Sequence, residues 1–308
     1  MKKVVVFGGG TGLSSLLRGL KLFPLDIVAV VSVADDGSST GKLRTEFDIP
    51  AVGDLRNVVI ALSETEPLLE ELFQYRFKSN GNFDRHSVGN ILLTALLNIN
   101  GNLTDAVSSF GKILNLKGKV LPLTEDKLTL VAYTDDEKII GEHNITKAFK
   151  TIKKIEYLKK PKVLDQVIKE IYEADLVIFS MGSLYTSIIP HLLCKEVREA
   201  LKNSKCEKMY ICNVMTEHGE TDNFKVSDHV KLLNKYAKFN MINVVIANTN
   251  EIDSEVKKKY YDLEKAEPVL VDDINIKIIK EQLSIINEGV VRHDPLKTGY
   301  TIFSYLMR

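Results

Sequence analysis

Residues 2–17 read KKVVVFGGGTGLSSLL, and this stretch decides the fold of the chain. A run of β-branched apolar residues, a cluster of glycines and a helical pattern follow one another, which predicts a buried strand, a tight turn and a helix. Glycines let the backbone approach an anion closely, and the first N–H groups of a helix have no carbonyl partner within it. The turn therefore predicts a phosphate site.

The glycine spacing leaves a second interpretation open. The dinucleotide fingerprint is G-x-G-x-x-G, and here Leu13 or Ser15 occupies the place of its third glycine. A turn that serves only the fold is therefore the alternative to ligand binding.

Apolar runs of strand length alternate with helical patterns along the rest of the chain. Further strands are expected at residues 26–33, 174–179, 208–212 and 241–247. Helices are expected near residues 13–22, 55–62, 88–97, 103–114, 163–172, 226–237 and 296–307. Strands separated by helices need crossover connections, so we predict an α/β, Rossmann-like fold whose mostly parallel sheet carries helices on both faces.

The segment at about residues 118–161 has a different pattern. Apolar and polar residues alternate there, which is typical of half-buried antiparallel strands. We expect a small, β-rich antiparallel insertion at 118–161. Because no linker-like composition separates the two halves of the chain, a single domain over residues 1–308 is predicted.

Composition narrows the class of protein. The 308 residues are 44% hydrophobic, with Lys+Arg and Asp+Glu balanced at 41 each, so no global positive field favours nucleic acid as a partner. No leader pattern precedes the first strand and no run approaches about 18 apolar residues, so we expect a cytoplasmic protein without membrane insertion. The cysteines, Cys194, Cys206 and Cys212, form no C-x-x-C pair and are expected to be reduced.

Polar residues follow every expected strand. In an open parallel sheet, ligands bind at the carboxyl ends of the strands. The segments concerned are the glycine loop and residues 34–41, 180–187, 213–216 and 248–250, which together predict a polar cleft. Asp35 stands where a nucleotide-binding fold places an acid for a ribose hydroxyl, although an acid is also an ordinary turn or capping residue.

Two clusters near helix starts add candidates. Asp54, Arg56 and Asn57 combine an acid, a bidentate phosphate donor and an amide, which suits a phosphorylated ligand; helix capping by Asp54 is the alternative. His86 and Asn90 form the second cluster, where a structural histidine is the alternative to a catalytic one.

Two further motifs are rejected. Residues 37–43 resemble a P-loop, but the glycine spacing is one residue short and Leu43 stands where Ser or Thr must hold magnesium, so ATP hydrolysis is excluded. The acids and the histidine of residues 217–222 lack a zinc or calcium spacing, so no metal is expected.

Six of these motifs, in this order and over nearly the whole chain, resemble the YvcK family, the putative gluconeogenesis factors. They lie at residues 8–13, 34–39, 53–57, 86–90, 182–187 and 213–216. The wider superfamily includes the 2-phospho-L-lactate transferases of coenzyme F420 biosynthesis. The resemblance implies a cytoplasmic bacterial protein that binds UDP-glucose or UDP-N-acetylglucosamine and supports cell shape and wall synthesis on gluconeogenic carbon sources. An NAD-like dinucleotide stays open as a ligand.

The resemblance also draws attention to two residues near the end of the chain. Tyr261 matches a family tyrosine that suits stacking on a uracil or sugar face, and Arg292 matches an arginine that suits a diphosphate. A surface aromatic and an ion pair with Asp294 are the respective alternatives. Ser38 and Met181 depart from the family pattern, which puts loop conformation and ligand preference in doubt.

The expected ligand-binding residues come from all of these segments. They are Gly9, Gly10, Thr11, Gly12, Leu13, Asp35, Asp36, Gly37, Ser38, Asp54, Arg56, Asn57, Asn90, Gly182, Ser183, Leu184, Tyr185, Asn213, Thr216, Tyr261 and Arg292.

Two function classes follow. The first is a non-catalytic sensor whose UDP-sugar occupancy controls contacts with a protein partner in wall synthesis, and a homodimer is expected. The second is a transferase of a phosphate-linked group, which needs a general base or a metal-binding acid beside the phosphate. Its candidates, Asp35, Asp36, Asp54 and His86, all have binding or structural explanations, so the sequence favours the sensor and assigns no catalytic residue.

Overall fold

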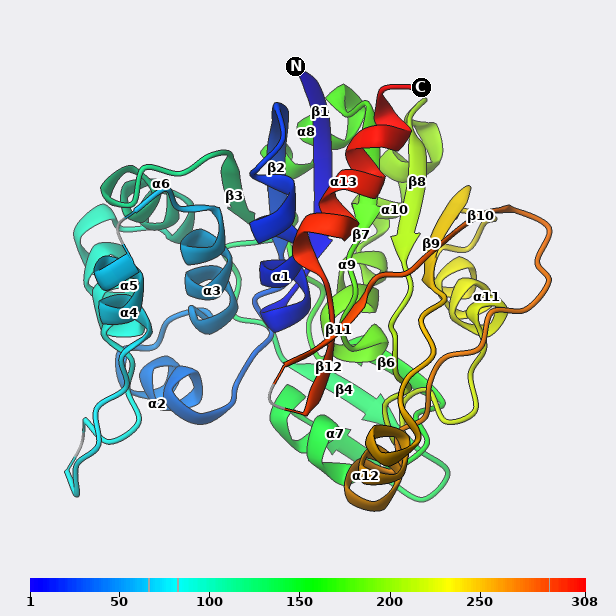
Figure 1. The fold of residues 1–308 in the computed structure, drawn as a ribbon. Coiled ribbons are helices and arrows are strands. Elements are labelled where there is room, and N and C mark those ends of the chain that lie inside the picture. Colours follow the sequence, from blue (N-terminus) through cyan, green and yellow to red (C-terminus); the bar gives the residue numbers. More distant parts are fainter. Residues whose placement is uncertain (66, 82, 288) are drawn as a thin grey trace.

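A central parallel sheet of seven strands organises the computed structural model, which describes residues 1–65, 67–81, 83–287 and 289–308, without the side chain of Ser38. The strand order is β10-β9-β8-β7-β1-β2-β3, and every pairing is parallel. The strands are β1 (Lys2–Gly8), β2 (Leu25–Val31), β3 (Lys119–Pro122), β7 (Leu176–Phe179), β8 (Glu207–Ile211), β9 (Val244–Asn248) and β10 (Lys277–Glu281) (Figure 1).

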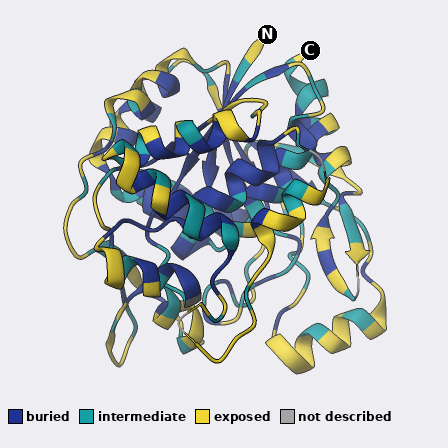
Figure 2. Ribbon diagram, turned by 90° about the vertical axis from the view of Figure 1, so that its left-hand side faces the viewer, coloured by how far each residue is buried: buried dark blue, intermediate teal, exposed yellow. Residues whose placement is uncertain are grey.

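Helices cover both faces of this sheet. Helices α3 and α13 pack against α1. Helix α8 contacts β1 and packs against α10. The helices are α1 (Gly10–Leu20), α2 (Ser38–Phe47), α3 (Gly53–Leu62), α4 (Pro67–Gln74), α5 (Val88–Asn100), α6 (Leu103–Ile113), α7 (Glu142–Ala148), α8 (Asp165–Glu173), α9 (Ile189–Leu193), α10 (Lys195–Asn203), α11 (Val226–Ala237), α12 (Ser254–Glu264) and α13 (Pro295–Leu306), with a π-helical turn η1 (Leu184–Ile188). Figure 2 shows the buried strands behind helices whose outer faces are exposed.

The predicted fold class is confirmed. All five expected strands and all seven expected helices are present, with ends shifted by a few residues. The strand residues Val4 to Phe7 are fully buried, as a central parallel strand requires. Several elements were not predicted from the sequence, among them β10, α2, α4, α10 and α12.

The expected insertion at 118–161 needs a correction at its N-terminal end. Residues 119–122 form β3, which pairs in parallel with β2 and belongs to the central sheet. Without β3, the backbone of β2 would present an unpaired edge. The antiparallel sheet consists of β4 (Leu130–Tyr133), β5 (Lys138–Ile140) and β6 (Lys154–Tyr157) in the order β5-β4-β6, with α7 between β5 and β6.

A two-stranded antiparallel hairpin, β11 (Ser284–Asn287) and β12 (Val290–His293), precedes α13. The side chain of Asn248, at the end of β9, accepts hydrogen bonds from the N–H groups of Leu283 and Ser284, each at 2.9 Å. The polar strand end thus fixes the start of the hairpin that carries Arg292.

The apolar core includes residues of the central sheet, the antiparallel sheet and α13. That residues 1–308 behave as one domain stays a prediction. None of the helices in the described part of the chain is long and apolar enough to cross a membrane.

Helices α1 and α13 cross with their backbones in close contact. A Cβ on Gly19 would lie 1.7 Å from the carbonyl oxygen of Pro295, and a Cβ on Gly299 would lie 2.7 Å from the carbonyl carbon of Gly19. No side chain larger than hydrogen fits at this crossing.

We predict that Gly19→Ala destabilises the protein, because the methyl group forces α13 away from α1. The expected loss is about 1–3 kcal/mol in the free energy of unfolding, measured by urea denaturation. Gly81→Ala is the control, since a Cβ there meets nothing within 4 Å. Equal stability of the two variants would contradict the close packing of these helices.

Candidate functional site

A cleft of about 400 Å³ lies at the carboxyl ends of β1, β7 and β8. Its lining comes from the glycine loop, the segments after β7 and β8, α12 and β12. The residues are Gly9, Gly10, Thr11, Gly12, Ser15, Met181, Gly182, Ser183, Ser187, Asn213, Val214, Met215, Thr216, Glu217, Tyr260, Glu264, Val290, Val291, Arg292 and His293. Nine of the expected binding residues therefore line one cleft: Gly9 to Gly12, Gly182, Ser183, Asn213, Thr216 and Arg292.

The glycine loop forms one wall because its backbone packs directly on the next strand end. A Cβ on Gly12 would lie 2.1 Å from the carbonyl oxygen of Met181. Helix α1 begins at Gly10, and its N-cap residue, Gly9, contributes no side chain to the helix end. The first turn of α1 lines the cleft, and the N–H of Gly10 donates to the carboxyl of Asp54. The N–H groups of Thr11 and Gly12 have no carbonyl partner within the helix, which suits a phosphate site.

Side chains from the loops after β7 and β8 continue this wall. The amide group of Asn213 accepts from the N–H of Gly182 and donates to its carbonyl oxygen, both at 2.9 Å. Ser183 donates its hydroxyl to Glu220 at 2.6 Å. The hydroxyl of Thr216 accepts from the N–H of Glu267 at 2.9 Å. Several expected ligand contacts therefore already have protein partners.

A group of carboxylates lies beside the glycine loop. Burial, and then the charges of Asp35 and Glu142, raise the pKa of Asp54 to about 8. Burial, and then Asp35, raise the pKa of Glu142 to about 7. A Cβ on Gly9 would stand 2.8 Å from Oδ2 of Asp54, so this acid lies against the loop. Near neutral pH, these raised pKa values favour the protonated forms of Asp54 and Glu142, which lowers the negative charge beside the glycine loop.

The antiparallel sheet contributes to this group through the start of α7. Asp36 accepts a 2.8 Å hydrogen bond from the N–H of His143, and Asp35 accepts one of 2.9 Å from the N–H of Gly37. Gly37 is the N-cap of α2, and Ser38, whose side chain lies outside the described atoms, is its first residue. The two aspartates thus order the segment after β2.

Glu217 is a cleft residue that sequence analysis did not select. Its Oε2 is buried and has no hydrogen-bond partner among the described residues. Burial, and then Glu220, raise the pKa of Glu217 well above its ordinary value. In the part of the chain that the structure describes, no three acids, histidines or cysteines are arranged to hold a metal ion.

A buried polar network accounts for the second helix-start cluster. The hydroxyl of Ser39 lies 3.0 Å from Nδ1 of His86 and accepts from Asn90 at 3.1 Å. Arg56 is buried and donates to Asn57 at 2.6 Å. His86, Asn90 and Arg56 do not line the glycine-loop cleft. The structure uses His86 and Asn90 to attach α2 to α5.

Other expected residues point elsewhere. Leu13, Leu184 and Tyr185 have buried side chains, and the Tyr185 hydroxyl donates to the carbonyl of Ile152 at 3.2 Å. Tyr261 is 51% exposed, with the Lys265 ammonium 4.9 Å from its ring centre.

The neighbouring Tyr260 lines the cleft in place of Tyr261, and its hydroxyl accepts from the N–H of Val291 at 2.7 Å. Tyr260 and Glu264 both border the cleft from α12. Their i, i+4 spacing is the signal in the sequence that could have identified them.

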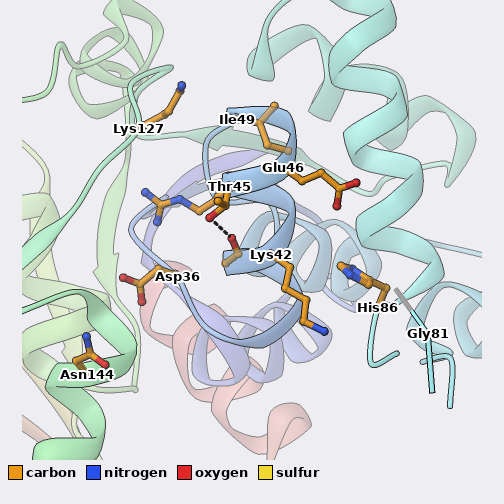
Figure 3. Close-up of a pocket in the computed structure, with 11 residues that line it drawn as sticks. Asp36, Lys42, Thr45, Glu46, Ile49, Gly81, His86, Lys127 and Asn144 are labelled. Carbon is orange, nitrogen blue, oxygen red and sulfur yellow. Dashed lines mark hydrogen bonds between the residues drawn. The ribbon is translucent and has the colours of Figure 1, made fainter. Parts of the chain in front are cut away.

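A larger pocket of about 970 Å³ lies beside α2. Figure 3 shows Lys42 pointing from α2 to the side on which His86 lies, while Asp36 lies on the other side toward Asn144. Arg44, also in its lining, donates to the carbonyls of Asp35 and Leu128. We take the smaller cleft as the candidate site because it contains the glycine loop and three strand ends.

Residues 4–291 match the CofD family, described as 2-phospho-L-lactate transferase CofD. The chain belongs to this family. Within this family, the chain is 44% identical over 308 residues to the gluconeogenesis factor of Halalkalibacterium halodurans. That alignment covers 98% of this chain and 95% of the relative. The chain is 43% identical over 312 residues to the gluconeogenesis factor of Bacillus subtilis, covering 99% of this chain and 98% of the relative. The predicted resemblance to the YvcK family is confirmed.

The solved structures agree with the fold. A crystal structure of a upf0052 family member from Bacillus halodurans superposes with a TM-score of 0.94 at 44% identity. The match covers 98% of this chain and 99% of that one.

We predict that Glu142→Gln stabilises the protein at pH 8 and has little effect at pH 4.5. The folded-state pKa of Glu142, about 7, lies above the ordinary value of 4.5, so its ionisation costs stability progressively as the pH rises from 4.5 to 7. We expect a gain of about 1–3 kcal/mol at pH 8, reduced by partial solvent screening. Urea denaturation at both pH values measures it. Glu71→Gln, at an exposed position, is the control, and equal gains in both variants would contradict the burial cost.

Proposed function

We propose that this protein is a cytoplasmic UDP-sugar-binding regulator, required for cell shape and wall synthesis during growth on gluconeogenic carbon sources. The observation that carries the proposal is that the N-terminal turn of α1 and Arg292 border the same cleft. The gluconeogenesis factors among its relatives support the part of the proposal that concerns gluconeogenic carbon sources.

The chemistry of the cleft fits a nucleotide diphosphate sugar. Backbone N–H groups of the glycine loop and the planar guanidinium of Arg292 suit the diphosphate. The ring of Tyr260 offers an apolar face with a polar edge, and Ser183, Asn213 and Thr216 supply donors and acceptors for ribose or sugar hydroxyls. A cleft of about 400 Å³ is within the range of small-molecule sites.

The proposal names a ligand and a protein partner. UDP-glucose or UDP-N-acetylglucosamine occupies the cleft, and an NAD-like dinucleotide, which also carries a diphosphate, is a competitor to test. Since α12 and the β11–β12 hairpin border the cleft, occupancy changes the surface that a protein of wall synthesis would contact. A homodimer remains part of the proposal.

Arg292→Ala should weaken UDP-N-acetylglucosamine binding roughly ten- to a hundredfold, since it removes a charge-assisted and bidentate contact of about 1.5–3 kcal/mol. Thr11→Ala should cost less, about 0.5–1.5 kcal/mol, because the backbone donors survive. Calorimetric titration measures both. Arg308→Ala, at an exposed arginine outside the cleft, is the matched control. Unchanged affinity in a folded Arg292→Ala protein would remove Arg292 from the site.

The CofD family match supports a second candidate, a transferase of a phosphate-linked group. Asp54 is the acid beside the glycine loop that such a reaction would use, and burial raises the pKa of this carboxyl to about 8, a value suited to proton transfer.

Purified protein incubated with UDP-glucose and Mg²⁺ separates the two candidates. We expect no release of UDP or sugar phosphate, because a sensor binds without turnover. Release by the wild type that Asp54→Asn abolishes, with an unchanged melting temperature, would establish the transferase and reject the sensor.

A further inference from the structure

A second cavity, of about 370 Å³, adjoins the glycine-loop cleft. It is bordered by α1, α3, α4 and the β11–β12 hairpin. Four of its lining residues, Thr11, Ser15, Arg292 and His293, also line the cleft. The two spaces therefore meet at the start of α1 and at β12. Asn57 does not line the glycine-loop cleft but borders this second cavity.

The lining of the second cavity contains two arginines, of which Arg18 is paired with Glu70, and it is rich in hydrogen-bonding groups. It contains Arg18 and Arg292, the amides of Asn57 and Asn287, and several hydroxyls. No carboxylate is among the lining residues that the structure describes. Such a lining favours an anion that also carries hydroxyl groups.

Arg18 is held in place from one side. Its Nη2 lies 2.5 Å from Oε1 of Glu70, and the same oxygen accepts from Gln74 at 3.0 Å. A guanidinium has five N–H donors, so this bond leaves others for a ligand. The Arg18 side chain is 37% exposed, which keeps it accessible. An arginine fixed in this way loses little conformational entropy when it binds a carboxylate.

We propose that this cavity binds a small organic dianion with two acidic groups and at least one hydroxyl, as a ligand separate from the nucleotide sugar. Arg18 pairs with one acidic group, Arg292 with the other, and Asn57 with the hydroxyl. The proposed function pairs Arg292 with the diphosphate, so the two ligands compete for one guanidinium and each weakens the binding of the other by the same factor. The cavity thus makes nucleotide-sugar binding responsive to a second metabolite class.

Malate, a hydroxylated dicarboxylate, is the probe, and lactate, with one carboxylate, is the matched comparison. Calorimetric titration at millimolar concentration should show that malate binds and that lactate binds at least tenfold more weakly. Arg18→Gln should weaken malate binding roughly ten- to a hundredfold. Arg308→Gln, at an exposed arginine outside the cavity, should leave it unchanged. Melting curves check that each variant is folded.

UDP-N-acetylglucosamine titrations of the same variants separate this proposal from the proposed function. Arg18→Gln should change nucleotide-sugar affinity by less than the loss for malate, because Arg18 lies outside the glycine-loop cleft. Absence of malate binding to the wild type, or equal binding of malate and lactate, overturns the dianion site. An equal loss for both ligands in Arg18→Gln shows instead that the cavity is part of the nucleotide-sugar site. If the nucleotide sugar does not bind while malate does, the proposed function fails and this inference stands.

Discussion

The contact between Gly12 and the carbonyl oxygen of Met181 is the constraint on which the rest of the site depends. Residue 12 has no room for a Cβ, so the first turn of α1 packs directly on the loop after β7. Asn213 then ties that loop to the end of β8 through both polar groups of Gly182. Three neighbouring strand ends are thereby joined into one continuous wall, and the first turn of α1 lines the space beside it.

Several carboxyl groups lie near this wall, and in their ionised form they would repel an anionic ligand. Burial keeps the pKa values of Asp54 and Glu142 at about 8 and about 7, and it raises the pKa of Glu217 as well. Asp36 instead accepts from the backbone N–H of His143, so its charge is used to dock α7. The segment between β5 and β6 therefore adds Glu142, at the start of α7, to the group of acids beside the glycine loop.

The sequence predicted the fold and one wall of the site because both depend on local patterns. Apolar strands followed by glycines or polar residues are visible without tertiary information. The β10 strand and the β11–β12 hairpin were missed because most of their side chains are half-buried or exposed, which removes the apolar run. Two adjacent tyrosines on a helix point about 100° apart, so only one of them can face the cleft. Residue type alone could not show that this one is Tyr260 and not Tyr261. Nor could it tell that Asn90 and His86 face α2, which only the packing of α5 decides.

The crossing of α1 and α13 also has a consequence for how the chain is made. Strand β1 can pair with β2 soon after both leave the ribosome, but its other edge waits for β7. The face of α1 at Gly19 stays uncovered until α13, drawn in red in Figure 1, has emerged. The nascent chain therefore carries this face of α1 uncovered while all the residues between α1 and α13 are synthesised.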